Sequence, residues 1–159
     1  AHAIAYFRGL LRWYETADIG VTGGDLYEAV AETLAEGGLR SALNPGHLSG
    51  HEEWHHSPVR PGSRERLASG MPLQIDVIPS PLPLGQALNC EDPITFANAE
   101  LRQELAAKYP ETSGRIEARR SFMRDVLGVE VKASILPLSS TPLCLPPFWL
   151  RPNDLLVRD

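Results

Sequence analysis

The sequence has little cysteine, no cluster of positive charge and no long apolar run, and each absence excludes a class of protein. Its two cysteines, Cys90 and Cys144, are far apart and predict reduced thiols in a cytoplasmic protein rather than a disulfide framework. The formal net charge is -5 at pH 7 and lysine and arginine do not cluster, which argues against a nucleic-acid partner. No apolar run approaches the roughly 18 residues of a spanning helix, and the first eight residues lack the order of a signal peptide. We therefore expect no membrane association.

The chain is long enough for one domain with a hydrophobic core. It has 159 residues, of which 43% are hydrophobic and 22% are charged. The spacing of apolar residues predicts helices over 3–17, 25–36, 98–108 and 114–127. Apolar runs predict strands over 71–78 and 88–97, joined by a proline-rich connection, and a tail over 136–152 that packs on the core. The fold expected is α+β, with helices packed on one face of a curved antiparallel sheet.

Histidine is concentrated in one segment. Four of the five histidines lie between residues 44 and 58, which read NPGHLSGHEEWHHSP. His47, His51 and His55 are spaced four apart, so on a helix they would share a face and could bind one zinc ion. The flanking prolines and Gly50 disfavour such a helix. The competing interpretation makes His47 a metal ligand on its own, with other ligands from elsewhere in the chain.

Two carboxylates follow, each embedded in an apolar, strand-like run. Asp76 shares one face of its predicted strand with Gln74, and Glu91 shares one face of the next strand with Asn89. A symmetric hairpin centred on residues 83 and 84 would set Asp76 opposite Glu91. Acidic residues rarely lie in apolar strands unless they are paired, hydrogen-bonded or bound to metal. Carboxylate oxygens with one imidazole suit Mn, Co, Fe or Zn.

These residues carry a resemblance to the pita-bread metallopeptidases, the superfamily of methionine aminopeptidase, Xaa-Pro aminopeptidase, prolidase and creatinase. A ligand histidine in a Gly-His-x-x-Gly context is matched by residues 46–50, and a His-x-x-Pro element by residues 55–58. A Gly-Met strand carrying a ligand acid is matched by residues 70–76, and a final Glu-Asp strand by Glu91-Asp92. With the helices before His47, the resemblance covers roughly residues 1 to 97 in the family's order. It implies that residues 1–159 are a single domain, the C-terminal portion of a larger catalytic domain.

The resemblance also implies a site and a reaction. His47, Asp76 and Glu91 would hold two divalent metal ions, and His55 or His56 would contact the substrate. The substrate would be a peptide or a small amide, and the reaction peptide-bond hydrolysis by a hydroxide that bridges the ions. Cys90 is expected to be a small core residue rather than a nucleophile. The segment 145–149 is expected to pack on the core, with a polyproline ligand as its alternative.

Three features depart from the family pattern. Asp76 stands where the family usually has glutamate, and the spacing from His47 to the second histidine is longer by one residue. The family also needs two upstream aspartates, which neither Asp18 nor Asp25 matches. A missing N-terminal segment or a partner chain, as in a homo-oligomer, would then supply them, and we expect this chain alone to be inactive. Alternatively, the protein is a catalytically silent binding or assembly module without the metal.

Overall fold

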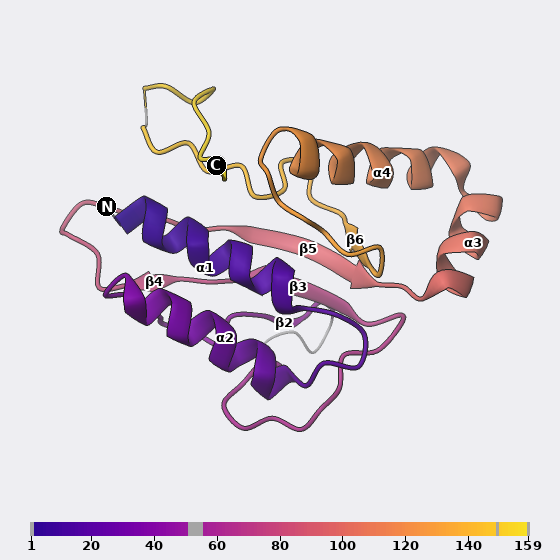
Figure 1. Cartoon of the computed structure of the whole chain (residues 1–159), viewed down its shortest axis with the longest axis horizontal. Coiled ribbons are helices and arrows are strands. Elements are labelled where there is room, and N and C mark those ends of the chain that lie inside the picture. Colours follow the sequence, from indigo (N-terminus) through magenta and orange to yellow (C-terminus); the bar gives the residue numbers. More distant parts are fainter. Residues whose placement is uncertain (1, 51–55, 149, 159) are drawn as a thin grey trace.

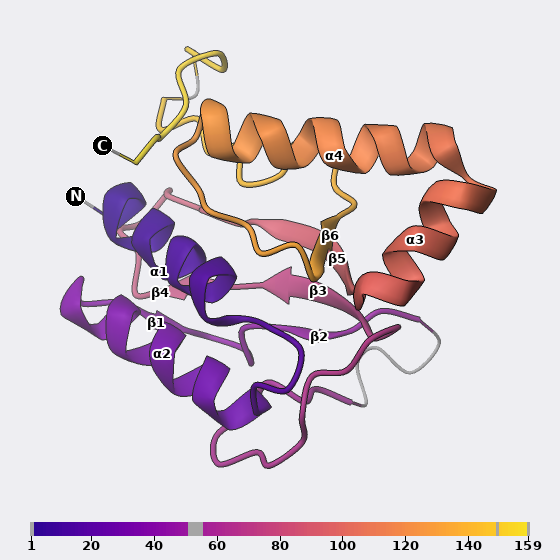
Figure 2. The same ribbon diagram turned by 45° about the vertical axis from the view of Figure 1, so that its right-hand side comes forward.

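Two helices cover one face of an antiparallel sheet. The computed structural model describes residues 2–50, 56–148 and 150–158. Helices α1 (His2–Thr16) and α2 (Gly23–Glu36) lie side by side across the sheet (Figure 1 and Figure 2). Its four strands, in the order β2-β3-β5-β6, are β2 (His47–Leu48), β3 (Pro72–Asp76), β5 (Glu91–Phe96) and β6 (Ile135–Pro137). The α+β fold expected from the sequence is confirmed.

The core lies between these two helices and the sheet. The strand residues that alternate toward α1 and α2, such as Leu73 and Ile75, are completely buried. The largest fully buried side chains on the helices are Tyr6, Leu10, Trp13, Tyr14, Leu26 and Leu34. Tyr6 donates its hydroxyl proton to the carbonyl of Val77 over 2.7 Å, and the Trp13 indole N–H donates to the carbonyl of Pro45 over 2.8 Å. These two hydrogen bonds connect α1 to the residue after β3 and to the segment just before β2.

The remaining helices pack at the β6 side of the sheet. Helix α3 (Ala99–Lys108) begins where predicted, because the Asn98 side chain caps it by accepting the Leu101 N–H over 2.9 Å. Helix α4 (Pro110–Asp125) begins four residues before the predicted start, because Pro110 suits a first helical turn. Figure 2 shows α4 running along β5 and β6, while α3 lies at one end of the sheet. No helix in the described part of the chain is long and apolar enough to cross a bilayer.

Two segments differ from the sequence predictions. The proline-rich connection contains β4 (Pro79–Ser80), which pairs only with β1 (Arg40–Ser41) in a separate two-stranded sheet. The tail supplies β6 as a fourth strand of the main sheet, and Leu145 is buried as expected. Phe148, however, is exposed, so the core packing expected for residues 145–149 does not include it. Leu155 and Leu156 pack against the core farther along the tail. His47 lies in a strand, so it does not share a helical face with His51 and His55, which lie outside the described residues.

Candidate metal site

The face of the sheet turned away from α1 and α2 carries the candidate ligands. In the antiparallel ladder His47 pairs with Gln74, and Asp76 pairs with Glu91. The predicted register of Asp76 opposite Glu91 is therefore confirmed. Directly opposed residues share a face, as do residues two apart along a strand. All four side chains thus lie on one face, while Ile75 between them points into the core.

His47 and Asp76 form a buried pair. The distance from His47 Nε2 to Asp76 Oδ2 is 3.7 Å, and the two side chains are 11% and 4% exposed. His47 Nδ1 lies 2.9 Å from the carbonyl oxygen of Leu48. A carbonyl only accepts, so Nδ1 must carry the proton and donate. Nε2 faces the Asp76 carboxylate, and when it carries no proton its lone pair is the one an imidazole offers to a metal ion.

The Asp76 carboxylate lacks a full set of partners. Its Oδ1 atom is buried and has no hydrogen-bond partner in the described part of the chain. Burial raises the pKa of Asp76, the charge of Glu91 raises it further, and His47 partly offsets both. A buried carboxylate oxygen without a partner is costly. A cation bound by this carboxylate would offset its charge and that of the opposing Glu91, and carboxylate oxygens with one imidazole are a donor set that fits a divalent metal.

Glu91 completes the acidic part of this face and is itself exposed. Its Oε2 accepts from the Gln74 side-chain amide over 2.8 Å, and its Oε1 accepts from the Asn89 amide over 2.5 Å. Nevertheless, within residues 2–50, 56–148 and 150–158 no three histidine, cysteine or acidic side chains gather closely enough to hold one metal ion. The described residues therefore bring two candidate ligands, His47 and Asp76, into contact, with Glu91 opposite Asp76.

In the second histidine element, residues 55–58, the described ring contact is not with the His47 face. His55 lies outside the described residues. His56 is exposed, and its Nε2 lies 2.8 Å from Glu65 Oε2. Arg60 pairs with the other Glu65 oxygen over 2.7 Å, and both partners lower the pKa of Glu65, Arg60 more than His56. The described contacts of the His56 ring thus connect it to the loop before β3, and not to His47 or Asp76.

The two aspartates nearest the N-terminus have local roles. Asp18 follows α1, where it accepts the Ser134 hydroxyl over 2.6 Å and the Ile19 N–H over 2.8 Å. The Asp25 carboxylate accepts the Thr22 hydroxyl over 2.7 Å in the first turn of α2. Neither lies on the strand face of His47.

Asp92 is the buried acid that sequence reasoning missed. Its Oδ2 accepts the Leu143 backbone N–H over 2.7 Å and the Cys90 S–H over 3.3 Å, with the Tyr14 hydroxyl at 3.4 Å. Burial and the nearby Asp92 charge raise the pKa of both Tyr14 and Cys90. Strand alternation was the available signal, because Glu91 on one face requires Asp92 on the other. Cys90 is a small buried residue, as expected.

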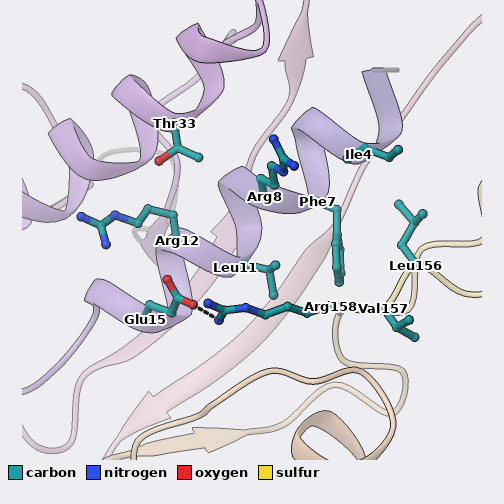
Figure 3. A pocket seen from close by; sticks show the side chains of 10 residues that line it. All are labelled: Ile4, Phe7, Arg8, Leu11, Arg12, Glu15, Thr33, Leu156, Val157 and Arg158. Atoms are coloured by element: carbon teal, nitrogen blue, oxygen red, sulfur yellow. Dashed lines mark hydrogen bonds and ion pairs between the residues drawn. The ribbon is translucent and has the colours of Figure 1, made fainter.

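A groove of about 620 Å³ lies on the outer side of α1 (Figure 3). Its walls come from α1, from Thr33 of α2 and from the C-terminal tail, where Arg158 forms an ion pair with Glu15. The residues lining it are Ile4, Phe7, Arg8, Leu11, Arg12, Glu15, Thr33, Leu156, Val157 and Arg158. None is a candidate ligand. Since α1 packs its other side on the sheet, the groove is separated from the His47 face.

Comparisons with known structures support the fold. The chain is similar to the dipeptidase PepE from Mycobacterium ulcerans, with 24% identity and a TM-score of 0.53, over 60% of this chain and 26% of that one. It is also similar to a dipeptidase from Pyrococcus horikoshii OT3, with 20% identity and a TM-score of 0.50, over 58% of this chain and 26% of that one. Comparisons with models of protein families and with curated proteins find no match. The chain thus spans about a quarter of each structure, and the likeness shows the α+β fold expected from the pita-bread resemblance.

The raised pKa of Asp76 predicts a pH dependence for the metal-free protein. A carboxyl group whose pKa is higher in the folded state binds its proton more tightly there, so stability falls as pH rises from the unfolded value of about 3.9 through the folded value. The Asp76→Asn variant has no such carboxyl group, so its free energy of unfolding should rise relative to that of the wild type as pH increases over this range. Urea unfolding in EDTA at several pH values measures the difference. A constant difference between the two proteins would contradict the assigned burial of the charge.

Proposed function

We propose that this chain carries part of the site of a metal-dependent peptidase of the Xaa-Pro aminopeptidase or prolidase type. The observation that carries the proposal is the buried His47–Asp76 pair. The Oδ1 atom of Asp76 in this pair has no partner among the described residues. Glu91 stands directly opposite on the same face of the sheet. A structural ion pair would be expected to satisfy its buried oxygens from within the protein. The buried Asp76 oxygen without a described partner suits a cation.

The residues that would hold the metal are His47, Asp76 and Glu91, with Mn, Co, Fe or Zn as the candidate ions. Two ligands of one ion at about 2.1 Å each lie at most about 4.2 Å apart, and the 3.7 Å between His47 Nε2 and Asp76 Oδ2 falls within that limit. When bound, such ions lower the pKa of a bound water and polarise a substrate carbonyl. Further ligands would come from residues outside this chain or from a partner chain.

The chain's own side chains have separate tasks in this proposal. His47 is oriented by the bond from its Nδ1 to the Leu48 carbonyl. Glu91, or an aspartate from upstream of this chain, would accept a proton from the attacking water and pass it to the leaving amine. His55 or His56 would contact the substrate carbonyl and stabilise the tetrahedral intermediate. If His56 has this task, its ring must leave Glu65, which it contacts in the structure.

Hydrolysis assays test the proposal. The complete polypeptide, with any segment or partner that supplies the remaining ligands, is expected to cleave dipeptides or Xaa-Pro peptides in the presence of Mn²⁺. The purified 159-residue chain is expected to cleave neither. A complete polypeptide that binds no metal and cleaves neither substrate would contradict the enzymatic proposal. Turnover by the chain alone would show that the site is complete within it.

A catalytically silent binding or assembly module is the second candidate. It is favoured by the shorter Asp76 in place of the family's glutamate and by the lack of a three-ligand group among the described residues. In this case Asp76 would remain a buried acid next to His47 without a metal. Metal content of the complete polypeptide separates the candidates, because only the peptidase requires stoichiometric metal.

A further inference from the structure

Both oxygens of the Glu91 carboxylate are held by side-chain amides. Gln74 Nε2 donates to Oε2 over 2.8 Å, and Asn89 Nδ2 donates to Oε1 over 2.5 Å. A carboxylate without a proton only accepts, so the amide nitrogens must face it. Glu91 is exposed, and an exposed glutamate otherwise samples many rotamers. The two bonds therefore restrain the one candidate ligand that burial does not restrain.

Gln74 lies at the centre of the candidate ligands. It pairs with His47 across β2 and β3 and lies two residues before Asp76 on the same face. Its amide then reaches the carboxylate that stands opposite Asp76. Asn89 approaches the same carboxylate from the segment before β5. The two amides thus come from both strands that carry the acidic ligands.

We propose that Gln74 and Asn89 are positioning residues that hold the Glu91 carboxylate beside Asp76 and so increase the affinity of this face for a divalent cation. The inference rests on the proposed function. Each carboxylate oxygen can accept more than one bond, so a restrained Glu91 keeps lone pairs for a metal. Outer partners that orient a ligand commonly change metal affinity by about 10-fold to 100-fold. Since Glu91 is exposed, the lower end of that range is expected here.

The opposite role makes an opposite prediction. If the amides take the place of a lost cation, they compete with a metal for the Glu91 oxygens. Removing them would then strengthen metal binding rather than weaken it. The sign of the change in affinity therefore distinguishes a positioning role from a substitute for metal.

Mn²⁺ binding measures that sign. Free Mn²⁺ is quantified by electron paramagnetic resonance during titration of the wild type, Gln74→Leu and Asn89→Ala. Each variant is expected to bind Mn²⁺ about 10-fold more weakly, with an unchanged thermal unfolding midpoint. Gln86→Leu is the matched control, because Gln86 is exposed in the same connection between β3 and β5 and its side chain makes no hydrogen bond within the described residues. Its affinity should equal that of the wild type.

The outcomes separate this inference from the proposed function. Wild-type affinity in both variants, or tighter binding, would overturn the positioning role while leaving the metal site intact. A wild-type chain that binds no Mn²⁺ would overturn metal binding by this face on its own, whereas the proposed function is tested with the complete polypeptide. In that case the contact is still tested in the metal-free protein, where Glu91→Ala should shift the side-chain amide NMR signals of Gln74 and Asn89. Unshifted signals would refute the restraint of Glu91.

Discussion

Asp92→Ala is expected to lower the free energy of unfolding by about 3 kcal/mol. The Asp92 Oδ2 atom accepts from the Leu143 backbone N–H and from the Cys90 thiol, with the Tyr14 hydroxyl nearby, and Asp92 is only 4% exposed. Removing the acceptor leaves a buried backbone donor without a partner, which alone costs about 1 to 3 kcal/mol. The Leu143 segment, which packs in the core, would also lose its polar attachment to β5.

Equilibrium unfolding in urea measures this loss. Asp125→Ala is the matched control, because Asp125 is exposed and, among the described residues, its side chain bonds only to its neighbour Arg124. The control should change stability by less than about 0.5 kcal/mol. A loss at Asp92 as small as that of the control would show that its bonds contribute little. Asp92→Asn should fall between the two, since an amide keeps one acceptor oxygen.

Adjacent acids in β5 illustrate how one strand serves two purposes. Glu91 and Asp92 are consecutive, so alternation places them on opposite faces of the sheet. Glu91 faces the candidate metal site, whereas Asp92 joins helix α1, strand β5 and the tail. A substitution at Glu91 is therefore expected to affect metal binding, and one at Asp92 to affect folding.

The sequence predicted the parts of the fold that depend on local spacing. Helical periodicity located α1 and α2, and the N-cap residue Asn98 located the start of α3. The register of Asp76 with Glu91 also followed from a symmetric hairpin. In contrast, β6 was missed because a three-residue strand within a proline-rich tail has no periodic signal. Its place beside β5 depends on long-range packing.

The candidate site was predicted only in part, for the same reason. The sequence pointed to His47, Asp76 and Glu91, and the structure brings His47 and Asp76 into contact. The choice between His55 and His56 stays a prediction, because His55 lies outside the described residues. Sequence alone could not find the Glu65 contact of His56, since loop geometry determines it. Nor could it show that both Glu91 oxygens already have amide partners.

This chain corresponds to only part of the structures to which it is similar. It spans about a quarter of the dipeptidase structures to which it is similar. The two aspartates nearest the N-terminus, Asp18 and Asp25, form hydrogen bonds at the end of α1 and the start of α2. Under the proposed function this chain holds only part of a site and is expected to bind metal weakly, because fewer ligands share the cost of removing the ion's water. A test of the metal hypothesis on this chain must therefore detect weak binding.

Paramagnetic broadening by Mn²⁺ is the measurement that tests the central claim most directly. Mn²⁺ is added in small amounts to the isotope-labelled chain, and the loss of NMR signal is followed residue by residue. We predict selective broadening at His47, Asp76 and Glu91, which disappears in His47→Ala while the folded spectrum is kept. Broadening confined to exposed acids such as Glu104 and Asp125, and equal in the wild type and His47→Ala, would contradict a metal site on this face.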